Sequence, residues 1–423
     1  MRIAVVGAGV VGVTTAYELA ADGHEVTVFE RHATPAEEAS FANAGLLGAS
    51  QVLPWAAPGT PGRLLTAMLM RQPMARLRRP LSLRELGWLW QWRRACTPQT
   101  FAANRELLQR LGLYSAERLR QLTHDLPISY EFGLGCLLLL RTRRDVDRVE
   151  PMLQSLRDAG VTVRAVDARQ AREIEPAIAG DTPLAGAIHL PHDPFGNCRQ
   201  FTMGLATGAE LLGAQFRFRT AVTAIDRSAP ATLRLADDPV PQRFDAVVLC
   251  AGTASGALLR PLGLALPLAP VHGYSISAHV HEPLNAPHGA VVDTRHRVTI
   301  TRLGRRVRVA GGAEFGGDAN SDGAPGGRQP AALQVLYKVL RDWFPTAAQL
   351  SDGVQVWRGA RPMLPDGLPV LGASGVPGLW LNLGHGAGGW ALACGSARLL
   401  ADLVVGQAPA IDLQGFGVAR LRR

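Results

Sequence analysis

Residues 2–30 read RIAVVGAGVVGVTTAYELAADGHEVTVFE, and this stretch decides the fold of the first domain. Its apolar runs predict a buried strand, a helix and a second strand in that order. Gly7, Gly9 and Gly12 stand between the first strand and the helix, in the spacing G-x-G-x-x-G. A strand, a glycine-rich turn, a helix and a strand in this order predict a dinucleotide-binding unit rather than a turn without a ligand.

Each glycine of the turn has a physical reason. Gly7 allows the tight turn, Gly9 lets a pyrophosphate approach the backbone, and Gly12 lets the helix pack on the strand. Val10 and Val11 begin the helix, where unpaired N–H groups and the helix dipole attract phosphate. The turn therefore predicts the phosphate-binding part of a nucleotide site.

The chain beyond this unit favours a flavin over a nicotinamide cofactor. Glu30 ends the second strand, where a carboxylate can hold ribose hydroxyls. The regular strand and helix pattern then stops, and it resumes with a buried strand over residues 244–252. It resumes once more with a strand over 378–383, a glycine-rich turn and a helix over 391–405. This interrupted layout is typical of flavin enzymes.

The predicted fold class is α/β plus α+β, with two domains. The first is a Rossmann-like nucleotide-binding domain with the discontinuous segments 1–62, 191–262 and 352–423, and the family resemblance given below implies that it is an FAD-binding domain. The second is a substrate-binding domain over 63–190 and 263–351, built on an antiparallel sheet and helices.

Composition excludes several classes of protein. The chain has 423 residues, 47% of them hydrophobic, and its 44 basic against 35 acidic residues give a net charge of +9. Disorder is excluded by this apolar content. Five scattered cysteines without a C-x-x-C pair argue against a disulfide framework and a structural zinc site. No apolar run reaches the roughly 20 residues of a membrane-spanning helix. Because the glycine motif begins at residue 7, no secretory signal precedes it, and we expect a cytoplasmic protein.

Several motifs together resemble one family of flavoproteins. They are the GAGVVG turn, ASFANAG at 39–45, WAAPG at 55–59, WRGARPMLPDGLPVLG at 357–372 and LNLGHGAGGWALACGS at 381–396. The chain is similar to the D-amino-acid oxidase superfamily, and within it to the bacterial FAD-dependent D-amino-acid dehydrogenases. LPHDPFGNCRQFT at 190–202 and HGYSI at 272–276 extend the resemblance over nearly the whole chain.

The resemblance implies a set of site residues. Arg361 matches the arginine that holds the substrate carboxylate, and Tyr274 matches a tyrosine near the substrate. Non-covalent FAD is expected, since no cysteine lies in the RGARPMLPDG segment, and no metal is expected. The residues expected to contact FAD are Gly7, Gly9, Val10, Val11, Gly12, Glu30, Arg31, Ser40, Asn43, Ala44, Gly45, Val222, Ala251, Gly252, Gly359, Gly384, His385, Gly386, Ala387, Gly388 and Gly389.

The expected reaction is the oxidative deamination of a D-amino acid. The Cα hydrogen leaves as hydride to N5 of the flavin, and the imine hydrolyses to a 2-oxo acid and ammonia. A planar arginine such as Arg361 suits the substrate carboxylate better than a lysine. Tyr274 either hydrogen-bonds that carboxylate or shapes the pocket, and His385 either contacts the flavin or holds its turn.

The electron acceptor stays open at this point. A dehydrogenase passes electrons to a quinone or another respiratory acceptor, whereas a D-amino-acid, glycine or sarcosine-type oxidase uses oxygen. Residues 63–94 are rich in Leu, Met, Trp and Arg, and Trp88 and Trp92 share a helix face that excludes Trp90. This segment either lies peripherally on the inner face of the cytoplasmic membrane or covers the substrate domain with an apolar face.

Two further functions are less well supported. A pI of about 10.0 is compatible with a flavin-dependent RNA-modifying domain. The basic residues, all arginines except Lys338, are dispersed rather than gathered in a stripe, so no nucleic-acid partner is expected. A non-catalytic flavin-binding module is the other alternative. The preferred side chain and the oligomeric state are not indicated.

Overall fold

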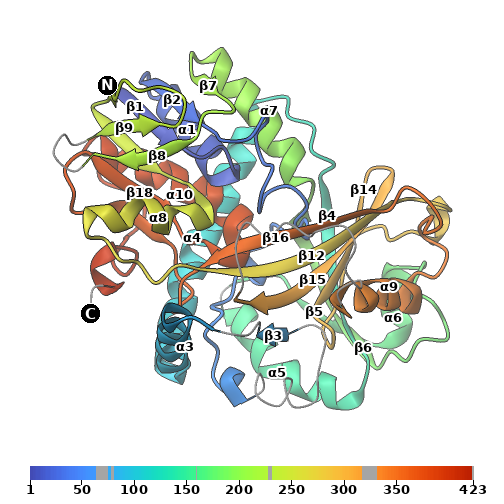
Figure 1. The fold of residues 1–423 in the computed structure, drawn as a ribbon. Coiled ribbons are helices and arrows are strands. Elements are labelled where there is room, and N and C mark those ends of the chain that lie inside the picture. The colour runs from blue at the N-terminus through green and yellow to red at the C-terminus, as the bar shows by residue number, and fades with distance from the viewer. Residues whose placement is uncertain (63–74, 78–80, 159, 227–230, 317–330, 422–423) are drawn as a thin grey trace.

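A computed structural model describes the chain except for residues 63–74, 78–80, 159, 227–230, 317–330 and 422–423. Two large sheets divide the molecule into two domains (Figure 1). Segments from the beginning, the middle and the end of the sequence meet in the first domain, on the left of the figure, whereas the long strands of the second domain fill the right. The predicted fold class is thereby confirmed.

The first domain contains a six-stranded sheet among the described residues. Its pairs are parallel except for β17 with β18. Odd-numbered residues of β1 (Arg2–Val6) face three helices, α1 (Val10–Ala21), α7 (Cys198–Leu211) and α10 (Gly389–Val404). Even-numbered residues of β1 face a small sheet and α8 (Ser255–Leu259). The strand order is β17 (Val370–Ala373), β18 (Leu379–Leu383), β11 (Ala246–Leu249), β1 (Arg2–Val6), β2 (Glu25–Phe29) and β7 (Gln215–Arg217).

Helices and a small sheet cover this first sheet on both faces. The helices are α1 (Val10–Ala21), α7 (Cys198–Leu211), α8 (Ser255–Leu259), α10 (Gly389–Val404) and the long α4 (Pro98–Asp125). The small sheet is formed by β8 (Val222–Ile225), β9 (Thr232–Leu235) and β10 (Gln242–Arg243). Because the sheet is covered on both faces, its strands are almost continuously apolar, as in AVVL of β11.

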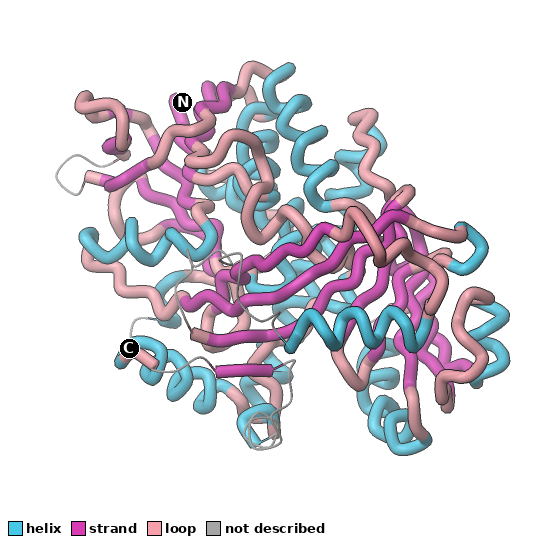
Figure 2. The backbone as a smooth tube through the Cα atoms, turned by 45° about the vertical axis from the view of Figure 1, so that its right-hand side comes forward, coloured by secondary structure: helices cyan, strands magenta, loops and turns pink. Residues whose placement is uncertain are grey.

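The second domain contains a larger, mainly antiparallel sheet, which counts nine strands in the described part of the chain (Figure 2). Alternate residues of its strands face α9 on one side and α5 on the other. The path is β16 (Gln355–Met363), β12 (Ala269–His279), β15 (Arg306–Phe315), β14 (Val298–Leu303), β13 (Ala290–Asp293), β4 (Gly133–Leu140), β6 (Gly186–Phe195) and β5 (Arg164–Val166), with β3 (Ala75–Leu77) paired to β15. The helices are α3 (Leu83–Ala95), α5 (Arg143–Asp158), α6 (Ala168–Ile174) and α9 (Ala331–Trp343).

Strand pairing corrects the predicted domain boundaries at three places. The boundary at residue 191 cuts through β6, which pairs with β4 and β5 in the larger sheet. The segment 352–423 includes β16, which pairs with β12 and therefore also belongs to the larger sheet. Helix α4, in the segment predicted for the substrate domain, packs against α10 of the first domain. The remaining domain assignment stays a proposal.

Candidate functional site

A cavity of about 570 Å³ lies between the two domains. The carboxyl ends of β1, β2, β11 and β18 open onto it from the first domain, and residues of β12, β15 and β16 line it from the second. Carboxyl ends of parallel strands are where such sheets bind ligands, and the volume is within the range of cofactor and substrate sites.

Close backbone packing shapes the glycine turn at the end of β1. Gly7 has a φ of +101°, and a Cβ there would lie 2.7 Å from the carbonyl oxygen of Cys250. A Cβ on Gly12 would lie 1.9 Å from the carbonyl oxygen of Gly7, so only glycine lets α1 pack so closely. Gly12 does not line the cavity, whereas Gly7 and Gly9 do. The N-terminus of α1 therefore faces the cavity, where the positive end of the helix dipole favours an anion.

Carboxylates next to α1 give the cavity an acid-rich side, formed by Glu30, Glu37 and Glu38. Glu30 accepts hydrogen bonds from the backbone N–H groups of Ala8 at 2.7 Å and His32 at 2.9 Å. Glu38 accepts a hydrogen bond from His32 and pairs with Arg31. Burial alone would raise the pKa of Glu38, but the hydrogen bonds from Arg31 and His32 outweigh it and lower that pKa.

Ser40 and residues 42–45 line the cavity where the two domains meet. The hydroxyl of Ser40 accepts a hydrogen bond from the N–H of Val10 at 3.1 Å. Thr301 of β14 donates to the carbonyl of Ala44 at 3.0 Å, and Arg308 of β15 donates to the carbonyl of Asn43 at 3.4 Å. Burial lowers the pKa of Arg308 to about 10. The larger sheet thus holds this segment at the cavity.

The turn after β18 carries the N-terminus of α10 to the cavity. Gly384 and Gly386 take positive φ values of +79° and +57°, which favour glycine. Nε2 of His385 lies 3.0 Å from the hydroxyl of Ser396 on α10. Burial lowers the pKa of His385 to about 3, so its ring is neutral at ordinary pH. Of the two roles predicted for His385, this geometry supports the holding of the turn, although the residue also lines the cavity.

Arg361 gives the cavity a second, contrasting side, which we call the Arg361 side. Its Nη1 donates to the carbonyl of Gly312 at 2.9 Å, and in the described part of the chain no carboxylate pairs with it. A Cβ on Gly273 would lie 2.4 Å from Nη2 of Arg361, so the missing side chain makes room for the guanidinium. Burial lowers the pKa of Arg361, yet arginine stays charged. A partly buried cation without an acid beside it is suited to bind an anionic ligand.

A bulge in β15 sets the position of the Gly312 carbonyl, which accepts the hydrogen bond from Arg361. The register of β12 with β15 shifts between His272 and Tyr274, and Gly312 has a φ of +85° at the shift. Bulges next to functional sites commonly redirect a group toward the site. Gly312 therefore presents its carbonyl to Arg361 because of the bulge.

Of the two roles predicted for Tyr274, the geometry favours shaping of the pocket over a hydrogen bond to the substrate carboxylate. This hydroxyl donates to Glu314 at 2.7 Å. The ring belongs to the core between the larger sheet and α9, on the face of β12 opposite to Gly273 and Arg361. The residue reaches the cavity lining, but its hydroxyl is directed elsewhere.

Sequence reasoning missed Trp357, which also lines the cavity. Its ring lies over Gly359, where a Cβ would be 1.6 Å from Cη2 of the indole. It stacks on Phe41 with ring centroids 6.2 Å apart. Trp357, Gly359 and Arg361 alternate along β16 and therefore share one face. This alternation in WRGAR is the signal that could have identified Trp357.

The structure brings nearly all predicted site residues to one cavity. Gly12 lies behind the lining, for the packing reason given above, and the other predicted residues line the cavity. These are Gly7, Gly9, Val10, Val11, Glu30, Arg31, Ser40, Asn43, Ala44, Gly45, Val222, Ala251, Gly252, Tyr274, Gly359, Arg361, Gly384, His385, Gly386, Ala387, Gly388 and Gly389.

Comparison with known sequences finds one family over most of the chain. Residues 2–403 match the family DAO, described as FAD dependent oxidoreductase. Two D-amino acid dehydrogenases of Cereibacter sphaeroides, from strains ATCC 17029 and ATCC 17023, are each 40% identical over 422 residues. The alignments cover 99% of this chain and 95% of each relative.

Comparison with solved structures finds the same fold. Glycine oxidase from Geobacillus kaustophilus is 25% identical with a TM-score of 0.73, covering 99% of both chains. L-proline dehydrogenase from P. horikoshii is 17% identical with a TM-score of 0.72, covering 100% of this chain and 98% of that one. An L-alpha-glycerophosphate oxidase from Mycoplasma pneumoniae with FAD bound is 15% identical with a TM-score of 0.68, covering 99% of this chain and 97% of that one.

Proposed function

The chain belongs to the DAO family of FAD-dependent oxidoreductases, and from this premise we propose that it oxidises D-amino acids as a dehydrogenase. The observation that carries the proposal is Arg361, a partly buried cation at the cavity whose described hydrogen bond goes to a backbone carbonyl. The 40% identity to D-amino acid dehydrogenases supports the choice of substrate. FAD, when bound, supplies the acceptor for the hydride from Cα of the substrate.

The residues at the cavity fit FAD. The N-terminus of α1 offers N–H groups to a pyrophosphate, and Gly9 leaves space for its approach because a Cβ there would meet only Ser40 at 3.5 Å. Glu30 lies where a carboxylate can accept from ribose hydroxyls. The N-terminus of α10 adds a second positive helix end, which suits the negative charge that a reduced flavin carries. These residues would hold the cofactor without a covalent link.

On the Arg361 side, the chain supplies binding and orientation. The guanidinium can form two parallel hydrogen bonds to the substrate carboxylate, which fixes Cα relative to the cofactor. Among the described lining residues the acids are Glu30, Glu37 and Glu38, all on the acid-rich side. None of the described lining residues places a carboxylate beside Arg361, and there a neutral substrate amine, from which hydride leaves more easily, is favoured.

Anaerobic reduction of the bound flavin tests this function. D-alanine or D-proline should bleach the flavin absorbance of the purified protein, and L-alanine should not. Bleaching by L-amino acids alone would reverse the proposed stereochemistry, and no bleaching by any amino acid would refute the proposal.

We further propose that the electrons pass to a quinone at the membrane. None of the described helices is long and apolar enough to cross a membrane. On α3, Trp88 and Trp92 are buried together, which confirms their shared face, whereas Leu83, Leu86 and Trp90 are exposed at helical spacing. Arg94 lies over the ring of Trp90, so this exposed face is both apolar and cationic, as a peripheral contact with anionic lipid requires. The rest of the predicted membrane segment, at 63–74 and 78–80, lies outside the described residues.

Two measurements test the acceptor and the contact. The bleached protein should be reoxidised faster by a soluble quinone than by oxygen, and faster reoxidation by oxygen would make it an oxidase. Vesicles containing anionic lipid should carry the protein in a flotation assay, and the change Trp90→Ala should weaken this binding. If the unchanged protein and Trp90→Ala float equally, or if neither floats, α3 does not bind the inner face of the cytoplasmic membrane.

A further inference from the structure

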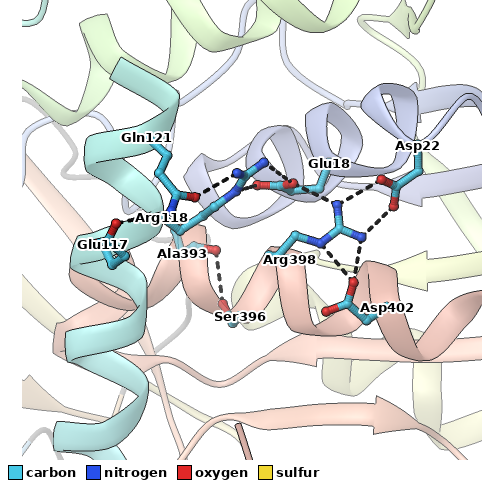
Figure 3. Close-up of polar contacts among 9 residues, drawn as sticks. All are labelled: Glu18, Asp22, Glu117, Arg118, Gln121, Ala393, Ser396, Arg398 and Asp402. Carbon is cyan, nitrogen blue, oxygen red and sulfur yellow. Dashed lines mark hydrogen bonds and ion pairs between the residues drawn. The ribbon is translucent and has the colours of Figure 1, made fainter. Parts of the chain in front are cut away.

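A cluster of charges around the buried Glu18 joins three helices of the first domain (Figure 3). Glu18 on α1 is at its centre, and its side chain is 0% exposed. Arg118 of α4 donates to both carboxylate oxygens of Glu18 at 2.8 Å, and Arg398 of α10 donates to one of them at 3.0 Å. Arg398 also pairs with Asp22 and Asp402. We call these five residues the three-helix ion cluster.

The geometry of the cluster is restrictive. Arg118 donates two parallel hydrogen bonds to Glu18, which fix the orientation of the two side chains as well as the distance between them. This hydrogen bonding raises the pKa of Arg118. Breaking a buried pair by neutralising one partner is costly, since the other charge stays buried without compensation. The cluster therefore favours one relative position of α1, α4 and α10.

Two of these helices, α1 and α10, begin at the cavity, and α4 packs on the chain next to it. Helix α1 begins at Val10 and α10 begins at Gly389, and both residues line the cavity. At 1.5 Å per residue, Glu18 lies about 12 Å along α1 from Val10, and Arg398 about 13 Å along α10 from Gly389. Helix α4 packs closely on Ala49, since a Cβ added to Gly112 of α4 would lie 3.2 Å from Cβ of Ala49. Ala49 directly follows Gly48, which lines the cavity. A change of angle between these helices would move both cavity-facing helix ends.

We propose that Glu18, Arg118 and Arg398 are positioning residues for FAD. They fix the angle at which α1 and α10 converge, and thereby the spacing of the two helix N-termini that face the cofactor. The three residues do not contact the cavity, since none of them is among its lining residues. The proposal depends on FAD as the family's cofactor and not on the identity of the substrate.

The test compares FAD affinity with stability in two variants, Glu18→Gln and Arg118→Gln. The purified holoenzyme is diluted, and the rise in fluorescence of released FAD gives the dissociation constant. We expect this constant to rise at least tenfold in each variant. Thermal unfolding with and without excess FAD supplies a second measurement, since a ligand that binds more weakly raises the melting temperature less at the same concentration.

A matched control comes from the second domain. Arg141 donates to the buried Asp293 and to Asp342, each at 2.8 Å, in an ion cluster remote from α1 and α10. Arg141→Gln should lower the melting temperature and leave the dissociation constant of FAD unchanged. An unchanged constant in Arg118→Gln, or an equal rise in Arg141→Gln, would overturn the proposal. The side chain of Arg118 is 22% exposed. If Glu18→Gln does not fold, the variant Arg118→Gln therefore decides the test.

Discussion

The acid-rich side and the Arg361 side of the cavity satisfy their charges in different ways. Glu30 accepts two backbone hydrogen bonds, and Glu38 pairs with Arg31 and His32. Arg361 instead donates to the carbonyl of Gly312, which leaves its positive charge without an acid in the described structure. The carboxylates of the acid-rich side thus have hydrogen-bond partners within the chain, and we propose that the Arg361 side binds an anionic group of the substrate. The predictions below test this difference, starting with the largest expected effect.

Removal of the charge of Arg361 should have the largest effect. For Arg361→Met we expect kcat/KM for a D-amino acid to fall about a thousandfold, since losing one partner of a buried charge pair costs about 4 kcal/mol. Arg361→Lys should recover part of this loss, because lysine keeps the charge but not the fork geometry. Stopped-flow reduction of the flavin measures both variants. A loss below tenfold in Arg361→Met would place the carboxylate elsewhere.

Displacement of Arg361 without loss of its charge should have a smaller effect. In Gly273→Ala the new Cβ would lie 2.4 Å from Nη2, so the guanidinium must move. We expect kcat/KM to fall about a hundredfold, mostly through KM, as for a displacement of about 1 Å. Gly180→Ala is the control, since nothing lies within 4 Å of its added Cβ. Equal kinetics in these two variants would show that Gly273 does not position Arg361.

A change on the acid-rich side should affect the cofactor and not the substrate. In Glu30→Gln the carboxylate is lost, and with it one charged acceptor, worth about 1.5 kcal/mol or more. We expect the dissociation constant of FAD to rise about tenfold, with KM for the D-amino acid unchanged at saturating FAD. A rise in KM would contradict the separation of the two sides.

The smallest expected effect concerns His385, whose turn adjoins the Arg361 strand through a bridge to Met363. The pKa of His385 is about 3 in the folded protein and about 6.5 unfolded. Protonation therefore favours unfolding, and the stability that the neutral ring provides is lost as the pH falls below 6.5. Between pH 6.5 and 5.5 the loss is about 1 kcal/mol. Urea unfolding at both pH values measures it, and His385→Gln should lose this part of the pH dependence. The same pH dependence in His385→Gln would assign it to another group.

Local patterns predicted the first domain well, because its signals lie close together in the sequence. The close packing at Gly12 involves the carbonyl of the nearby Gly7, although Gly7 itself also packs against the distant Cys250. The paired strands of the second domain are different, since the face of a residue depends on register. For Tyr274 the sequence left a hydrogen bond to the substrate and a role in shaping the pocket open, because the packing of its ring against α9 depends on strand alternation and on the bulge at Gly312.

Long-range pairing also explains what the sequence could not indicate. Glu18 stands in a helix pattern where an acid suggests a solvent-exposed position, yet it is fully buried because Arg118 and Arg398 come from distant helices. Arg361 was identified as a candidate, but which described residues lie beside it depends on the meeting of three strands. Charge compensation of this kind is a property of the assembled fold, and no local pattern carries it.

The interleaved order of the first sheet has a consequence for synthesis. Residue 3 of β1 pairs with residue 246 of β11, and residue 247 pairs with residue 379 of β18. At a translation rate of 5–20 residues per second, β11 follows β1 by roughly 10–50 s. Until β11 has been made, the edge of β1 that pairs with it has no partner strand. The carboxyl ends of the strands that line the cavity come together only after β18 has been made, so a cofactor that binds there is taken up after the synthesis of residues 379–383.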